Sequence, residues 1–166
     1  MSGSNMPEKR VVRREHFLAE ESEKIIEHLE DISTWTSWMK STSHIISSTQ
    51  KKLEKGDEFE LQRIIKGALI QEKWSVSEVR ISNTRPKFYE LMLTLDAQSR
   101  MGKAVGGAVK SLSLAITVLS DERQSGAEIC IDYTIKGGYR LAAKWVRGSI
   151  EQMAKSWLLD LTGIIS

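Results

Sequence analysis

Between residues 44 and 135, apolar side chains recur at every second position in five successive segments. This period of two is typical of half-buried β-strands, because successive side chains of a strand point to opposite faces. We predict a run of six antiparallel strands in this region, with one face buried. The predicted inward residues are Phe59, Leu61, Ile65, Ile70, Trp74, Val76, Tyr89, Leu91, Leu93, Leu95, Leu112, Leu114, Ile116, Val118, Ala127, Ile129, Ile131, Tyr133 and Ile135.

The first two of these segments predict a hairpin with a defined register. A two-residue turn at Gly67-Ala68 places glycine first, as a type II′ turn prefers. Arg63 and Glu72 share the inward parity of their strands, and this register makes them face each other directly. They can form a buried ion pair or a solvated pair near the mouth of a groove. The other predicted pairs are Ile65 with Ile70, Leu61 with Trp74, and Phe59 with Val76.

After "KGG" the apolar period changes to about 3.6 residues, which predicts one amphipathic helix of roughly 25 residues. Such a helix is too apolar on one side to stand alone, so we expect it to lie on the curved face of the sheet. The predicted apolar side comprises Tyr139, Ala142, Val146, Ile150, Met153, Trp157, Leu161 and Ile164. The opposite side carries Arg140, Lys144, Arg147, Glu151 and Lys155, which we interpret as a solvated face.

The segments before the sheet predict one strand and two short helices. "VVRREHFLAE" reads as a first strand and "EESEKIIEHLED" as an amphipathic helix with Ile25, Ile26 and Leu29 on one side. In "EDISTWTSWMK", Trp35 and Trp38 are three residues apart and would share one helical face. We expect this pair to form an apolar plug against the rest of the chain.

Composition bounds the class of protein. The chain has 166 residues, of which 40% are hydrophobic and 28% charged, and its formal net charge is +2. This balance argues against nucleic acid as a partner, because phosphate binding needs concentrated Lys and Arg. The single cysteine, Cys130, suits a reducing compartment, and no apolar stretch reaches membrane-spanning length, so we expect a cytoplasmic protein. We predict a disordered tail over residues 1–9 and a single domain over residues 10–166.

The order of elements and two segments resemble a known superfamily. "DISTWTSWM" is similar to the segment that follows the early helices in START-like, helix-grip (SRPBCC) proteins of the polyketide cyclase/dehydrase-like group. "SGAEICIDYTIKGGYRLAAKWV" is similar to their last strand, glycine break and start of the long helix. The resemblance implies an α+β helix-grip fold. Its seven-stranded curved antiparallel sheet would carry two short helices after the first strand and the long C-terminal helix on its concave face. It also implies that Trp35 and Trp38 close one end of the groove between sheet and helix.

Other chemistries find little support in the sequence. The cluster Gly102, Gly106 and Gly107 fits neither nucleotide-binding motif and reads as a flexible connection between strands. His16, His28 and His44 lack the spacing of metal ligands, so we expect no metal or other cofactor. Cys130 has the outward parity of its strand, and we interpret it as an inert thiol.

Members of the resembled superfamily typically keep a cavity for apolar molecules, so our main hypothesis is binding of a lipid, sterol or polyketide-like molecule. An alternative is a polyketide cyclase or dehydratase, in which Arg63, Glu72, Tyr89 and Tyr133 would polarise carbonyls and move protons. Another is a filled-core relative that works on a protein partner, at ribosomes or with chaperones; a homodimer also stays open. The predicted ligand-binding residues are Phe59, Leu61, Arg63, Glu72, Trp74, Tyr89, Leu91, Leu93, Leu114, Ile116, Ile131, Tyr133, Val146, Ile150, Met153 and Trp157.

Overall fold

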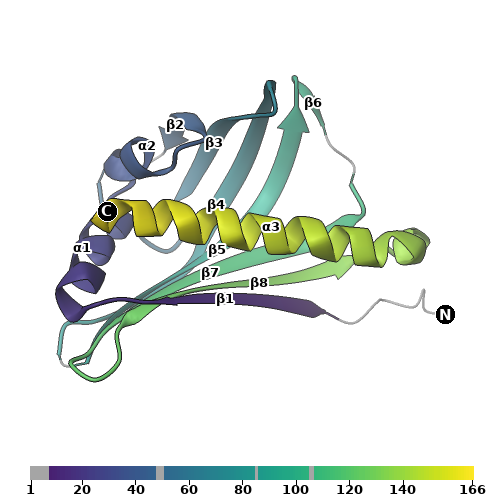
Figure 1. Cartoon of the computed structure of the whole chain (residues 1–166). Helices are drawn as coiled ribbons and strands as arrows, with labels where there is room; N and C mark the ends of the chain where they lie inside the picture. Colours follow the sequence, from purple (N-terminus) through teal and green to yellow (C-terminus); the bar gives the residue numbers. More distant parts are fainter. Residues whose placement is uncertain (1–7, 48–50, 85, 105–106) are drawn as a thin grey trace.

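The computed structural model describes residues 8–47, 51–84, 86–104 and 107–166 (Figure 1). Seven strands form one antiparallel sheet in the order β1-β8-β7-β5-β4-β3-β2, and the short β6 pairs with β5. The strands are β1 (Lys9–His16), β2 (Thr42–Ser47), β3 (Glu58–Ile65), β4 (Ala68–Ser82), β5 (Lys87–Arg100), β6 (Lys103–Ala104), β7 (Val109–Ser120) and β8 (Gly126–Ile135). The helices are α1 (Ala19–Glu30), η1 (Ile32–Thr34), α2 (Trp35–Trp38), η2 (Gly137–Ala142), α3 (Ala143–Thr162) and η3 (Gly163–Ile165).

The curved sheet holds α3 across its concave face, and α1 and α2 gather at the C-terminal end of that helix (Figure 1). This arrangement confirms the predicted helix-grip architecture, including its seven-stranded sheet and the short helices after the first strand. The first seven residues of the predicted tail lie outside the described part of the chain, and β1 already begins at Lys9.

The C-terminal helix is shorter than predicted. Tyr139 leaves helical geometry, with φ −113° and ψ 23°, and its side chain is 43% exposed. The regular α-helix therefore starts only at Ala143, after the short 3₁₀ segment η2. Its buried side nevertheless follows the predicted period, because Val146, Ile150 and Trp157 are all buried against the sheet.

The predicted register of the β3–β4 hairpin is wrong by two residues. The loop is Lys66-Gly67 rather than Gly67-Ala68, and Ile65 pairs with Ala68. Both loop residues have positive φ, 50° and 77°, which is the geometry of a type I′ turn and matches the twist of the flanking strands. A shift of two residues preserves the face of every side chain, so Arg63 and Glu72 still share the concave face as diagonal neighbours.

Two β-bulges interrupt the pairing of β4 with β5. One lies between Lys73 and Trp74 of β4, where Lys73 pairs with Ala97 and Trp74 with Leu95. Asp96 is therefore an extra residue in β5, and it reverses which positions face inward beyond it. Gln98 consequently pairs with Glu72 and shares its concave face, although the odd-numbered inward pattern of β5 predicts the opposite.

Candidate functional site

One end of the sheet–helix groove is filled by aromatic rings. Trp35 is fully buried and contacts Trp38, Phe59 and Trp157 at centroid distances of 5.2, 5.3 and 6.0 Å. Its indole N–H donates to the Leu29 carbonyl of α1 at 3.0 Å, which ties the plug to the neighbouring helix. The burial of both tryptophans confirms that they pack as an apolar plug between α1, the sheet and α3.

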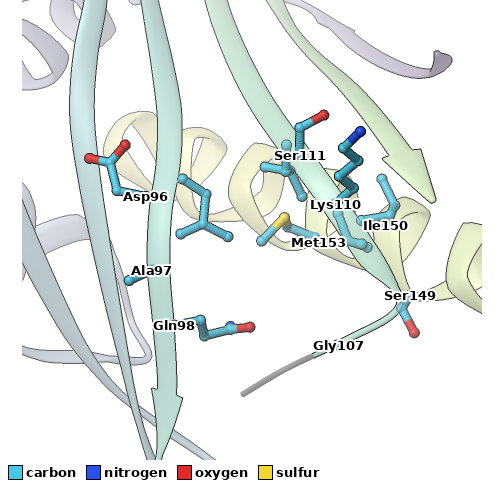
Figure 2. Close-up of a pocket in the computed structure, with 12 residues that line it drawn as sticks. Asp96, Ala97, Gln98, Gly107, Lys110, Ser111, Ser149, Ile150 and Met153 are labelled. Atoms are coloured by element: carbon cyan, nitrogen blue, oxygen red, sulfur yellow. The ribbon is translucent and has the colours of Figure 1, made fainter. Parts of the chain in front are cut away.

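The sheet opens at the end of the groove opposite this plug. The ladder between β5 and β7 runs only as far as the pair Thr94 and Ser113. Beyond that pair, among the described residues, β5 pairs with β4 and β6, while the start of β7 pairs only with β8. The bulge at Asp96 stands at this point, and a bulge bends its strand, so the two strands diverge (Figure 2).

A pocket of about 360 Å³ occupies the opening between the diverging strands and α3 (Figure 2). Met153 and Ile150 of α3 lie across it from the strands, and Leu95, Val109 and Leu112 add further apolar surface. This size falls in the range of small-molecule sites, which combine apolar walls with a few polar groups. The polar and small residues of the lining are Asp96, Ala97, Gln98, Gly107, Lys110, Ser111 and Ser149.

A buried polar cluster lies between the plug and the pocket. The Arg63 guanidinium is 4% exposed and donates to the Ser41 hydroxyl at 2.8 and 3.1 Å. It also donates to Glu72 Oε1 at 3.4 Å, and Glu72 is 2% exposed. The pair is therefore buried, as one of the two sequence-based interpretations held. Such a pair offsets the cost of burying each charge without guaranteeing net stability.

Gln98 connects this cluster to the pocket. Its side-chain amide donates to Glu72 Oε2 at 3.2 Å, while Gln98 itself lines the pocket. The Trp74 indole N–H donates to the other carboxylate oxygen of Glu72 at 3.4 Å. A molecule in the pocket would thus lie one side chain away from a buried carboxylate and its guanidinium partner.

Burial perturbs two further ionisable groups inside the groove. Desolvation raises the pKa of the Asp160 carboxyl on α3 above its ordinary value, although nearby Arg63 and Lys40 lower it. Desolvation also raises the pKa of the Tyr89 hydroxyl, with a further contribution from the charge of Glu30. Both groups are therefore biased toward their neutral, protonated forms, which can donate a hydrogen bond.

Five buried side-chain atoms have no hydrogen-bond partner within the described part of the chain: the hydroxyls of Ser22, Tyr89 and Tyr133 and the indole nitrogens of Trp38 and Trp157. Tyr133 pairs across the ladder with Leu112, a pocket residue. Trp157 lies one helical turn beyond the pocket residue Met153, on the same side of α3. A buried polar group without a partner is costly, but none of these atoms belongs to a residue that lines the pocket.

The predicted ligand-binding residues all lie in the groove, but the pocket involves few of them. Met153 and Ile150 line it, and Met153 is partly buried. The other fourteen are buried in the core around α3 or in the polar cluster. Their role in binding stays a prediction.

Sequence reasoning missed two polar residues of the site. Asp160 went unnoticed because a lone acidic residue in a charged helix reads as exposed. Gln98 went unnoticed because an even position in β5 reads as outward, and only the bulge turns it inward. The sequence signal for the bulge is weak, since Asp96 is one polar residue after an apolar run.

Of the predicted glycine cluster, Gly107 lines the pocket, Gly102 occupies the β5–β6 turn with φ 80°, and Gly106 is outside the described residues. Desolvation raises the pKa of the Cys130 thiol, which disfavours the nucleophilic thiolate. Within the described ranges, no group of three His, Cys, Asp or Glu side chains could hold a metal ion. In the same ranges, no helix is long and apolar enough to cross a bilayer.

Comparisons with known proteins show which fold this chain shares. No protein-family model and no curated protein matches the chain. Ginseng major latex-like protein 151 from Panax ginseng aligns with a TM-score of 0.63 and 10% identity, over 95% of each chain. The Zhui aromatase/cyclase from Streptomyces sp. R1128 aligns with a TM-score of 0.62 and 12% identity, over 95% of this chain and 93% of that one.

A further similar structure is Ara h 8.0201, with a TM-score of 0.61 and 6% identity over 96% of this chain and 99% of that one. At identities this low, the similarity supports a shared fold but not a shared function. The chain therefore has the START-like helix-grip fold that the sequence resemblance implied.

Proposed function

We propose that the chain binds an apolar small molecule, such as a lipid, a sterol or a polyketide-like compound, between the sheet and α3. The observation that carries the proposal is the pocket of about 360 Å³ where β5 leaves β7. Its lining combines apolar residues, among them Met153 and Ile150, with polar groups such as Gln98, as ligand sites usually do. A relative with a filled core that acts only on a protein partner would not need a pocket here.

The polar residues of the pocket lining sharpen the ligand class. Gln98 and Ser149 line the pocket, and their amide and hydroxyl groups can donate hydrogen bonds. A ligand that carries carbonyl or hydroxyl oxygens on an apolar body could accept these bonds. We therefore favour an oxygenated apolar molecule over a pure hydrocarbon.

A second candidate function, cyclisation or dehydration of a polyketide-like substrate, is supported by one specific observation. Gln98 joins the pocket to the buried Glu72 carboxylate, which is hydrogen-bonded to Arg63. A guanidinium beside a bound carbonyl would stabilise developing negative charge. Binding is the first requirement of both functions, so it is tested first.

Titration with pyrene, an apolar fluorophore, tests binding directly. The proposal expects micromolar-range affinity that Met153→Trp weakens about tenfold or more, because the larger side chain takes up pocket volume. The matched control is Gln152→Trp, which adds a Trp one position away on the exposed side of α3 and should bind normally. Thermal unfolding would establish that both variants fold.

Native mass spectrometry of the protein purified from the cells that make it supplies the ligand's identity. The proposal expects a non-covalent mass of small-molecule size on the wild-type chain and its loss in Met153→Trp. Folded wild-type protein that binds no pyrene and carries no adduct would overturn the proposal.

A further inference from the structure

The first turns of the C-terminal helix carry an apolar patch that the packing of the fold does not use. Leu141 is 105% exposed, Trp145 is 78% exposed and Tyr139 is 43% exposed. Leu141 and Trp145 are four residues apart, so they lie one turn apart on the same side of the helical segment. A large apolar side chain left singly in water is ordinary, but three gathered in one short segment indicate a contact surface. We call these three residues the apolar patch.

Basic side chains flank the apolar patch in the sequence. Residues 136–150 contain four basic side chains, Lys136, Arg140, Lys144 and Arg147, and no acidic one. Glu151 follows and pairs with Arg147 at 3.1 Å. The combination of Trp, Tyr and Leu with flanking Lys and Arg is the pattern by which interfacial helices bind anionic membrane surfaces.

The shape of the apolar patch distinguishes a bilayer from a protein partner. The start of α3 lies at the end of the molecule opposite α1 and α2 (Figure 1), and Leu141 and Trp145, which belong to this part of the chain, are strongly exposed. Projecting side chains need a matching recess in a rigid partner, whereas a lipid surface deforms around them. The flanking positive charge further selects a surface of negative charge.

We propose that the chain docks on anionic bilayer surfaces through the apolar patch, with Lys136 and Lys144 contacting the head groups. Ser149, one turn beyond Trp145 on the same side of α3, lines the pocket between β5 and β7. Docking therefore brings that opening close to the interface, where an apolar molecule could enter or leave. Vesicle binding requires no ligand in the pocket, so the inference stands apart from the proposed function.

The test is binding of the full chain to phosphatidylcholine vesicles, with and without phosphatidylserine as a minority component. We expect binding to the mixed vesicles only, and its loss in high salt. Of the five tryptophans, the four besides Trp145 are buried, so Trp145 alone should give a blue-shifted emission and protection from a water-soluble quencher.

Two double variants separate the apolar and electrostatic parts. Leu141→Ser with Trp145→Ser should weaken binding about tenfold or more, and Lys136→Glu with Lys144→Glu should weaken it by a similar factor. The matched controls are Leu159→Ser, a 56% exposed leucine near the other end of α3, and Lys24→Glu, an exposed lysine on α1. Both controls should bind like the wild type.

Three outcomes would overturn the inference. The chain could fail to bind the mixed vesicles, or it could bind neutral and mixed vesicles equally in all variants. The third is a dimer in analytical ultracentrifugation that the Leu141 and Trp145 substitutions dissociate while vesicles stay unbound, which would assign the apolar patch to a second copy.

Discussion

The two ends of the sheet–helix groove use the same architecture and differ in what fills them. At the α2 end, the buried indole ring of Trp35 packs against those of Trp38 and Trp157. At the other end, smaller side chains and a strand that bends away leave a pocket of about 360 Å³. Side-chain volume and one β-bulge, rather than a different fold, thus separate a core from a candidate binding site.

The largest effect that we expect is at the closed end. Trp35→Ala should lower the free energy of unfolding by about 3–5 kcal/mol, because it removes a fully buried indole and its hydrogen bond to Leu29. Urea unfolding followed by circular dichroism measures this change. A loss below about 1 kcal/mol would contradict the plug, since that is typical of an exposed site.

The Arg63–Glu72 pair, between the two ends, should show a smaller but clear coupling. A double-mutant cycle with Arg63→Met and Glu72→Gln should give a coupling free energy of about 2 kcal/mol, because each single change leaves a buried charge without the opposite charge to which it is bonded. Exposed pairs typically contribute about 0–1 kcal/mol, so the exposed pair Arg147 and Glu151 is a suitable reference. Equal coupling in the two cycles would contradict a buried pair.

Truncation at the open end should cost less than at the closed end. Met153→Ala should lower the free energy of unfolding by about 1–2 kcal/mol, because the side chain is only partly buried and already borders empty volume. The same urea experiment gives this value. A cost equal to that of Trp35→Ala would mean that both ends are packed alike.

The smallest effect should be a pH dependence from Asp160. Desolvation raises its pKa in the folded chain, so the folded state holds this proton more tightly than the unfolded state. Stability from this group is present at low pH and is lost as the pH rises from the ordinary carboxyl value through the raised one.

Asp160→Asn cannot ionise, so its free energy of unfolding should lose this part of the pH dependence. Urea unfolding at several pH values from about 4 to 7 measures it. The exposed carboxyl Glu27, changed to Gln, is the control and should leave the wild-type profile intact. A profile that Asp160→Asn also leaves intact would show that burial does not shift this group.

The fold was predictable from the sequence because it depends on periodicity. Alternating strand residues such as Leu91 and Leu114 and the 3.6-residue period from Val146 to Trp157 survive small errors of register. The β3–β4 hairpin is an example. Lys66 adopts a positive φ, which is uncommon for residues other than glycine, and the turn lies one residue earlier than predicted. The pairing changed, yet Arg63 and Glu72 kept their shared face.

The pocket was much less predictable. The strand period turns Leu91 of β5 toward α3 and the helical period turns Met153 of α3 toward the sheet, but neither says whether the space between them is filled. The opening depends on where β5 stops pairing with β7, and that depends on the bulge at Asp96.

The exposed Trp145 could have been predicted from the sequence, because it interrupts the charged side of an amphipathic helix.

Methyl and indole NMR spectra recorded during a pyrene titration test most directly whether one end is open and the other closed. We expect shifts of the Met153 and Ile150 methyl signals, assigned with Met153→Leu and Ile150→Val, and unchanged indole N–H signals from Trp35 and Trp38. Shifts centred on Trp35 and Trp38, with the Met153 methyl signal unmoved, would contradict this expectation.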